Sequence, residues 1–146
     1  MANFSEIPWI AAHIALYKSD PEKAHNWDSS ELGGPGILPT LLLTTVGRKS
    51  AEPRSVPLIY GEHGSSFVII ASKGGMATHP VWYLNLVANP ECEIQVGARH
   101  FKVKARVEEG DARETIWNHM TTVYAPYIDY QKNTERKIPV VVLDPI

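Results

Sequence analysis

The residues of this 146-residue sequence that could do chemistry gather in a few short stretches. The first is the turn Gly47-Arg48-Lys49-Ser50, which is followed by Arg54 on the next predicted strand. Clustered cations and a hydroxyl at one tight turn, together with the turn N–H groups, predict a cradle for phosphate or carboxylate groups. A solvated hairpin tip has the same composition, and Glu52 is placed to neutralise part of its charge.

The second stretch follows the end of a predicted strand at Ala71. It reads Ser72-Lys73-Gly74-Gly75 and combines a hydroxyl, an ammonium group and two glycines. Glycines let a ligand approach the backbone closely, so the loop amides could bind the polar edge of a planar ring. A flexible loop that needs glycine for its own geometry is the alternative interpretation.

Aromatic side chains characterise the remaining stretches. The segment 79–86 (HPVWYLNL) predicts a short helix, and its Trp82 is typical first of a residue that faces a core. Tyr124, Tyr127 and Tyr130 recur every third residue just past a predicted helix end. Such phenols could wall a pocket for an aromatic or quinonoid substrate and offer a hydrogen-bond donor or proton source, although packing at the domain edge is the alternative.

Taken together, these stretches describe an extended ligand. An acidic tail would lie at the basic turn, a planar polar ring at the Ser-Lys-Gly-Gly loop, and a second aromatic molecule against the tyrosines. A redox coenzyme with a phosphate tail has this shape.

Composition and missing motifs exclude several other classes of function. With Lys+Arg 14 and Asp+Glu 16 the net charge is −2, which argues against a general nucleic-acid binder. The single cysteine, Cys92, excludes an internal disulfide and any CxxC site, and the six histidines lack metal-ligand spacing, so no metal site is predicted. GxSxG and GxGxxG are absent, and the turn at 47–50 lacks the spacing of a phosphate-binding P-loop.

The sequence predicts a cytoplasmic protein. Its single cysteine fits a reducing compartment. Glu6 and Pro8 interrupt the place of a signal-peptide core, and the longest apolar stretch is shorter than the ~20 residues that span a bilayer. The N-terminal helix could lie on the inner membrane face and serve a lipid quinone. Lys18 and Lys23 are its only cations, however, so packing on the rest of the domain is favoured.

The elements that must position these residues change in character near residue 40. Helices are expected over 5–18, with Ser5 as N-cap, and from Asp20-Pro21 to about Trp27, followed by a Gly/Pro-rich linker over 28–40. Strands are then expected over 41–46, 54–60, 67–71, 93–96, 101–108 and 138–143, with a turn over 62–65, helices over 79–88 and 111–124, and a polar segment over 127–137.

This order of elements predicts a mainly β, α+β domain. Its strands are short and mostly hairpin-connected, which favours an antiparallel barrel or sandwich over a doubly wound parallel sheet. The wholly apolar last strand should be central in its sheet. Asp111 and Glu114 have the spacing of a capping box at the start of the long helix.

In this order, the stretches resemble the deazaflavin (coenzyme F420)-dependent nitroreductase family of actinobacteria. The similarity rests on LLLTTVGRKSAEPRSVPLIY, IIASKGGMATHPVWYLNLVANPECEIQV, YAPYIDYQ and IPVVVLDP, and it covers about residues 31–146. It implies a split β-barrel over 31–146 that is akin to FMN-binding relatives and binds F420 non-covalently, preceded by an N-terminal helical segment over 1–30. Barrels of this family often dimerise, so a homodimer is compatible with the resemblance.

The resemblance also assigns roles to individual residues. The phosphate and glutamate tail of F420 would be held by Arg48, Lys49, Ser50 and Arg54. The deazaflavin ring and ribityl chain would be surrounded by Pro57, Ile70, Ser72, Lys73, Gly74, Val81 and Trp82. The substrate pocket would be formed by Tyr124, Tyr127 and Tyr130, together with Ile59, which stands where some members carry a tyrosine. The shape of this pocket sets which acceptor is used.

The implied activity is an F420H2-dependent reductase. It would transfer a hydride to an electron-poor acceptor such as a quinone, an activated enone, ester or lactone, or a nitroaromatic. Ser72 or Tyr127 would donate a hydrogen bond to the substrate oxygen, and Tyr127 or solvent would supply the proton. Two alternatives stay open at this point, namely an FMN-binding reductase with the same barrel and a non-catalytic F420-binding carrier.

Overall fold

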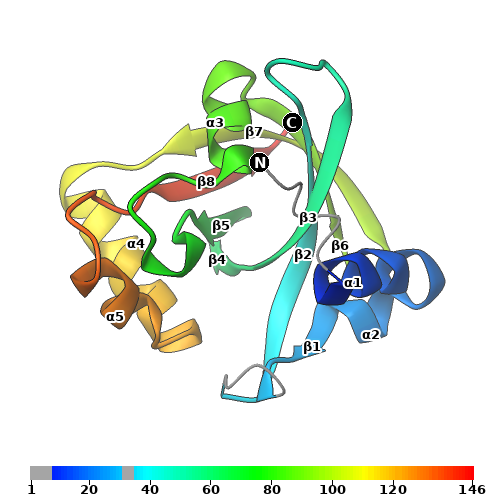
Figure 1. Ribbon diagram of the computed structural model, residues 1–146, viewed down its shortest axis with the longest axis horizontal. Coiled ribbons are helices and arrows are strands. Elements are labelled where there is room, and N and C mark those ends of the chain that lie inside the picture. Colours follow the sequence, from blue (N-terminus) through cyan, green and yellow to red (C-terminus); the bar gives the residue numbers. More distant parts are fainter. Residues whose placement is uncertain (1–7, 31–34) are drawn as a thin grey trace.

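In the computed structural model, which describes residues 8–30 and 35–146, a single curled antiparallel sheet organises the chain (Figure 1). Its strands are β1 (Asn26–Asp28), β2 (Ile37–Val46), β3 (Pro53–Ile59), β4 (Gly61–His63), β5 (Ser66–Ile70), β6 (Glu91–Val96), β7 (Arg99–Val107) and β8 (Val140–Pro145). The order is β1-β2-β6-β7-β8-β5-β4, and β3 also pairs with β2. Every ladder is antiparallel.

The sheet curls into a barrel that stays open along one side. β3 pairs only with β2 and β4 only with β5, and within the described residues no ladder joins β3 to β4 or β5. The expected mostly antiparallel split β-barrel is therefore confirmed. The opening matters for function because backbone groups and side chains along both of its edges can face a ligand.

Two apolar clusters share the central strands β5 and β8. The larger cluster fills the inside of the barrel and includes Ile69 and Leu143, which are fully buried. The smaller one lies on the other face, where Val68 and Val142 pack beneath helices. Successive residues of a strand point to opposite faces, so a strand that is covered on both sides must be apolar throughout. This explains the run IPVVVL and confirms that the last strand is central.

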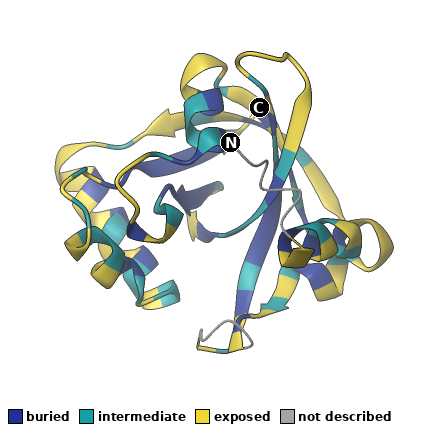
Figure 2. Ribbon diagram, in the orientation of Figure 1, coloured by how far each residue is buried: buried dark blue, intermediate teal, exposed yellow. Residues whose placement is uncertain are grey.

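Helices lie around the barrel (Figures 1 and 2). They are α1 (Pro8–Ser19), α2 (Pro21–His25), α3 (Val81–Ala88), α4 (Gly110–Val123) and α5 (Tyr127–Lys132), with the short 3₁₀ turn η3 (Lys73–Gly75). Tyr17 of α1 and Ala24 of α2 pack on Leu42 of β2, while α4 and α5 cover the outer face of β5 and β8. The two helical groups thus stand on opposite sides of the opening.

Several element predictions are wrong in instructive ways. The linker expected over 28–40 is wrong at both ends, because Asp28 ends β1, residues 37–40 begin β2, and these two strands pair despite Pro39. The turn expected at 62–65 is narrower, since Gly61–His63 forms β4. The polar segment after Pro126 begins with α5, because this proline occupies the N-cap. The helix cap Asp20 is confirmed, as its carboxylate accepts from the Lys23 amide at 3.3 Å.

The beginnings of two other helices also differ from expectation. The capping box of Asp111 and Glu114 is not formed. The N-cap of α4 is Glu109 without a side-chain hydrogen bond, and Glu114 pairs with Arg113 instead. The proposed N-cap Ser5 lies outside the described residues. The boundary near residue 30 between a helical segment and the barrel stays a prediction.

The burial of β8 on both faces can be tested by making the same Val→Ala substitution at a buried position and at an exposed one. Val142→Ala removes two methyl groups from a side chain that is fully buried, so the free energy of unfolding should fall by roughly 1.5–3 kcal/mol. Val87→Ala on α3, where the side chain is 63% exposed, should leave it unchanged or slightly higher. Urea unfolding at one temperature measures both, and equal effects would contradict the assignment of β8 to the core.

Candidate active site

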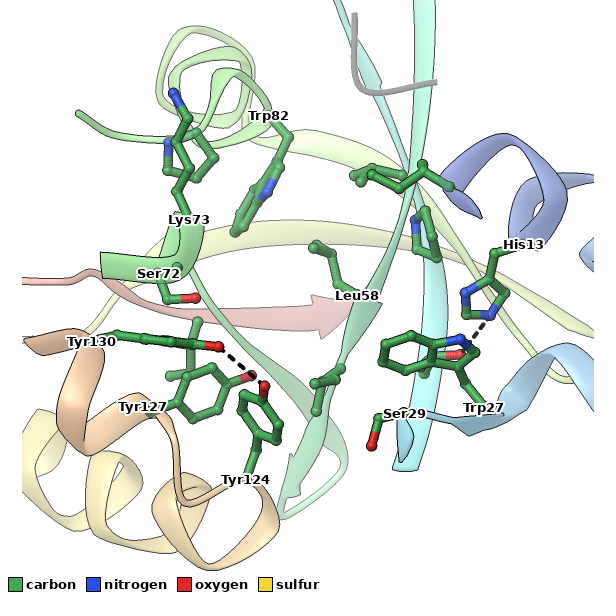
Figure 3. A pocket seen from close by; sticks show the side chains of 18 of the residues that line it. His13, Trp27, Ser29, Leu58, Ser72, Lys73, Trp82, Tyr124, Tyr127 and Tyr130 are labelled. Carbon is green, nitrogen blue, oxygen red and sulfur yellow. Dashed lines mark hydrogen bonds between the residues drawn. The ribbon is translucent and has the colours of Figure 1, made fainter. Parts of the chain in front are cut away.

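A cavity with a volume of about 430 Å³ occupies the open side of the barrel. Its floor comes from residues 56–59 of β3 and Ile70 at the end of β5, and one wall comes from the 72–76 loop and Trp82. The three tyrosines form a second wall, and α1 and β1 form the opposite one (Figure 3). Cofactor and substrate sites have this size and this mixture of apolar walls with a few polar groups.

The cavity brings together most of the residues that the sequence singled out. Those that line it are Pro57, Ile59, Ile70, Ser72, Lys73, Gly74, Trp82, Tyr124, Tyr127 and Tyr130. Val81 is not a lining residue; it begins α3 next to Trp82 and is half-buried. The cations and the serine of the basic turn lie outside the cavity.

The 72–76 loop has an unusual backbone where it borders the cavity. Lys73, Gly74 and Gly75 have φ of 46°, 63° and 80°, which is the left-handed region. A Cβ on Gly75 would lie 2.7 Å from the carbonyl oxygen of Tyr130, so only glycine allows this close approach to α5. The ammonium group of Lys73 donates to the Thr78 hydroxyl at 3.1 Å. Within the described residues the Ser72 hydroxyl has no hydrogen-bond partner, so it is free to donate to a ligand.

The three tyrosines form a compact group because a helix ends at Tyr124 and α5 begins at Tyr127. The Tyr124 and Tyr130 hydroxyls are 3.1 Å apart and bonded to each other. The Tyr127 ring stands edge-on to Tyr124, with centroids 5.0 Å apart, and only 4% of the residue is exposed. Burial, reinforced by the two neighbouring phenols, raises the pKa of Tyr127 far above its usual range. Its hydroxyl therefore stays protonated and can act as a donor.

The basic turn between β2 and β3 is held in place by Asn85 of α3. The buried Asn85 side chain accepts from the Arg48 amide at 3.1 Å and donates to the Thr45 hydroxyl at 3.2 Å. Arg48 and Lys49 project from this turn as exposed side chains. A strand rises ~3.3 Å per residue, so the start of β3 at Pro53 lies roughly 10 Å from the cavity floor at Val56. A ligand longer than a ring system could reach from the cavity to the turn.

The charge of this turn is smaller than its composition suggests. The Arg54 guanidinium lies 3.4 Å from the Glu52 carboxylate, and both side chains are exposed. The Ser50 hydroxyl accepts from the Glu52 amide at 3.2 Å, which closes the turn. Neutralisation by Glu52 is thus seen, and it leaves Arg48 and Lys49 as the cations of the turn without an acidic partner among the described residues.

An aromatic wall on the N-terminal side of the cavity was missed by the sequence. Trp27 of β1 stacks on both Trp9 and His13 of α1, with centroids 5.8 and 5.6 Å away and planes inclined by 15° and 24°. Figure 3 shows Trp27 beside His13 on this side of the cavity. Ser29 and Thr40 complete this side of the cavity. Trp9 and His13 are neighbours on α1, but Trp27 meets them only after β1 has paired with β2, so no local spacing predicts this wall.

His13 is the titratable group of this wall, and it is kept neutral. Its Nε2 lies 2.8 Å from the carbonyl oxygen of Ala24, to which it must donate, and 3.3 Å from the Thr40 hydroxyl. The residue is 5% exposed, and desolvation by burial lowers its pKa, although the bond to Ala24 acts in the opposite direction. The wall therefore presents flat, uncharged rings to the cavity.

The described ranges 8–30 and 35–146 contain neither a group of metal-ligating side chains nor a helix suited to span a membrane. No group of three or more His, Cys, Asp or Glu side chains there could hold a metal ion. No helix in these ranges combines the length and the apolar character that crossing a bilayer requires.

Comparisons with known proteins agree with the family suggested by the motifs. The family model described as F420H2-dependent quinone reductase matches residues 20–145. An F420H2-dependent quinone reductase of Mycobacterium tuberculosis (strain ATCC 25618 / H37Rv) is 45% identical over 112 residues, which cover 75% of each chain. A solved structure described as an F420-H2 dependent reductase (FDR-A) is 40% identical with a TM-score of 0.67, covering 72% of this chain and 93% of its own. A domain-swapped dimer is 35% identical with a TM-score of 0.71, covering 92% and 94%.

The burial of His13 predicts how stability depends on pH. A histidine whose pKa is lowered by folding binds fewer protons in the folded than in the unfolded state, so stability is full above the unfolded pKa of ~6.5 and falls as the pH drops below it. His79, whose pKa is also lowered by burial and by Arg136, acts in the same direction. The urea midpoint should decrease between about pH 7.5 and about pH 5.5.

A substitution distinguishes the contribution of His13 to this pH dependence from the contributions of other titratable groups. His13→Gln keeps a donor for the Ala24 carbonyl but does not titrate, so the decrease in midpoint should become smaller. His119→Gln, at an exposed position of α4, should leave the decrease as in the unaltered protein. A variant His13→Gln with an undiminished pH dependence would show that this imidazole titrates equally in both states.

Proposed function

The chain belongs to the F420H2-dependent quinone reductase family, and we propose that it reduces a quinone by hydride transfer within the cavity between β3 and the three tyrosines. F420 is the cofactor, and the chain is an F420H2-dependent reductase. One observation carries the proposed acceptor and site: a cavity walled by flat rings contains two hydroxyls, of Ser72 and Tyr127, without a partner among the described residues. A planar acceptor whose oxygen must be stabilised suits such a site.

The residues present fit F420. The apolar floor of the cavity accepts a planar ring, while the Ser72 hydroxyl and the exposed Gly74, which has open space where a Cβ would be, suit its polar edge. We assign the ring and the ribityl chain to Pro57, Ile70, Ser72, Lys73, Gly74, Val81 and Trp82. The acidic tail would extend along β3 to the turn, where Arg48, Lys49, Ser50 and Arg54 would hold it. Because Glu52 already pairs with Arg54, Arg48 and Lys49 should contribute most of the binding.

The remaining residues would serve the acceptor. When bound, reduced F420 supplies a hydride and so a two-electron reduction. The Tyr127 hydroxyl would donate a hydrogen bond to the acceptor oxygen on which negative charge develops, and the Ser72 hydroxyl, which lies on the same side of the pocket as the tyrosines, would be a second donor (Figure 3). Because burial raises the pKa of Tyr127, this phenol holds its proton, and solvent at the cavity mouth is the better source of the proton that completes the product.

The choice of acceptor should follow from the shape of the pocket. Ile59, Tyr124 and Tyr130 line it together with the aromatic wall of Trp27 and His13. Flat apolar walls favour a fused-ring quinone, and activated enones, esters or lactones share the electron-poor carbon and the carbonyl oxygen that the site would recognise. Nitroaromatics are the further candidates, for which Ile59 in place of a tyrosine removes one hydroxyl from the pocket.

Two earlier alternatives lose their support, and three lesser proposals stay. The family match favours F420 over FMN and an enzyme over a passive carrier. We propose that the enzyme works in the cytoplasm, where Cys92 stays a thiol. Its pKa is raised to about 12 because it is buried. Peripheral membrane contact and a homodimer stay predictions, the latter favoured by the similarity to a domain-swapped dimer.

The proposal is tested by titration followed by an acceptor screen. Calorimetry with oxidised F420, FMN and a nicotinamide coenzyme should show tight uptake of F420 alone. Oxidation of F420H2 should then be fast with menadione and slower with an unsaturated lactone or a nitro compound. Binding without oxidation by any acceptor would contradict the proposed reaction.

Removing the buried phenol should affect the reaction more than cofactor binding. Tyr127→Phe deletes the donor to the developing negative charge, so kcat with menadione should fall by roughly 10²-fold while the Kd for F420 changes little. Tyr83→Phe, outside the cavity, is the matched control and should leave both constants unchanged. An unaltered kcat for Tyr127→Phe would remove this residue from the mechanism.

Removing one cation of the basic turn should weaken cofactor binding in a salt-dependent way. Lys49→Ala loses a charge-assisted contact to the acidic tail, so the Kd for F420 should rise roughly ten- to a hundredfold at low salt and less at high salt. Lys104→Ala on β7, likewise an exposed lysine, controls for the change in net charge. If both variants bind F420 equally well, the tail lies elsewhere.

A further inference from the structure

The side chain of Arg136 does not line the cavity, yet it holds the loop that does. It lies between α5 and β8, and its guanidinium group donates from all three nitrogens. The acceptors are Met76 O at 2.8 Å from Nε, Ala71 O at 3.2 Å and His79 Nδ1 at 3.1 Å from Nη1, and Ser72 O at 2.8 Å from Nη2. A guanidinium cannot accept, so Nδ1 of His79 is the acceptor and this imidazole is neutral.

The loop needs these hydrogen bonds because its own conformation is unfavourable. Lys73 has a side chain and still adopts φ of 46°, and the two glycines after it continue in the left-handed region. Non-glycine residues occupy this region only where the surroundings hold them there. Arg136 supplies that hold, since it binds carbonyl oxygens on both sides of the left-handed residues, at Ser72 and at Met76.

Arg136 is itself fixed to the helix that carries the tyrosines. The side-chain amide of Gln131, on α5, donates to the carbonyl oxygen of Arg136 and accepts from the Ile138 amide, each at 2.9 Å. At the other end of the loop, Gly75 is packed against the backbone of Tyr130. The loop and α5 are thus connected in two ways, by the hydrogen bonds of the planar Arg136 guanidinium and by the close backbone contact of Gly75 with Tyr130.

We propose that Arg136 is a positioning residue that sets the distance between the cofactor-binding edge of the cavity and its tyrosines. This inference rests on the proposed function, because Ser72 to Gly74 would contact the deazaflavin and Tyr127 the acceptor. Arg136 would touch neither ligand. It would keep their binding groups a fixed distance apart, and hydride transfer depends steeply on that distance.

The charge-preserving variant Arg136→Lys tests this role. A lysine keeps the positive charge but presents a point charge in place of the planar fork, so it cannot bind the four acceptors together. In the free protein, hydrogen–deuterium exchange should become faster in two segments at once, the amides of 72–76 and those of α5. With F420H2 and menadione, kcat should fall by roughly 10²-fold and the KM for F420H2 should rise.

The matched control is Arg106→Lys on β7. The Arg106 guanidinium binds Asp144 at 2.7 Å and also pairs with Glu108, far from the cavity in sheet order. This variant should leave exchange in both segments and both kinetic constants unchanged. A general loss of stability would instead raise exchange across the core strands and would affect kcat and KM only through the amount of folded enzyme.

A second variant keeps the test decisive if Arg136→Lys does not fold. Gly75→Ala leaves Arg136 intact but adds a Cβ 2.7 Å from the Tyr130 oxygen, so it should loosen the same two segments together. The proposal is overturned if a folded variant speeds up exchange in the 72–76 loop but not in α5, or if it speeds up exchange in neither segment. It is also overturned if Arg136→Lys has normal kinetics while Arg136→Gln loses F420 in a salt-dependent way, since Arg136 would then bind the acidic tail directly. Failure of the unaltered protein to bind F420 would contradict the proposed function but not the exchange result.

Discussion

The failure of β3 to pair with β5 is the constraint on which the site depends. A closed barrel of this size fills its interior with side chains, as the inner cluster around Leu43 and Ile69 does here. At the open side, β3 and the end of β5 instead face a cavity of about 430 Å³. The elements next to this gap are helices and loops, and they leave it open as a cavity.

Among the described residues no ladder joins the two edges of the opening, and polar side chains hold the irregular segments beside it. Asn85 fixes the basic turn to α3 through one backbone amide and one hydroxyl. Arg136 fixes the loop after β5 to the segment that follows α5. Both side chains bind backbone atoms of irregular segments, which would otherwise leave donors and acceptors unsatisfied. Such residues act on the site without touching a ligand, so their importance is visible only in the folded chain.

The features of the fold and the site that could be predicted from the sequence are those whose interacting residues lie close together along the chain. Local patterns predicted the short antiparallel strands, the 72–74 loop and the three tyrosines, because each pattern is complete within a few residues. The split barrel and the cavity residues Pro57 and Ile59 on β3 were instead implied by the family resemblance. α5 was missed because its six residues directly follow Pro126 and are too few for a helical pattern to be recognised. β1 was missed because three residues beside a Gly/Pro-rich stretch give no strand signal, although they pair with β2.

The parts of the site that escaped prediction all depend on contacts between distant segments. The stack of Trp9, Trp27 and His13 exists only because β1 brings Trp27 next to α1. Arg136 meets acceptors that lie 57 to 65 residues earlier in the chain. A single arginine or tryptophan in a sequence is compatible with many roles, and only the fold decides among them.

The positions of the charged groups indicate that binding of the acidic tail and the reaction itself depend on different parts of the site. The cations Arg48 and Lys49 lie on the exposed turn, roughly 10 Å along β3 from the cavity, where an acidic tail can be bound without placing a charge near the reacting atoms. Inside, His13 is neutral and Tyr127 holds its proton, because burial lowers the pKa of the first and raises that of the second. Where the cavity excludes water, the few hydrogen bonds made to charge that develops during the reaction become stronger. Binding energy gained at the remote turn can then orient the ring inside the cavity, and the hydroxyls act only on the acceptor.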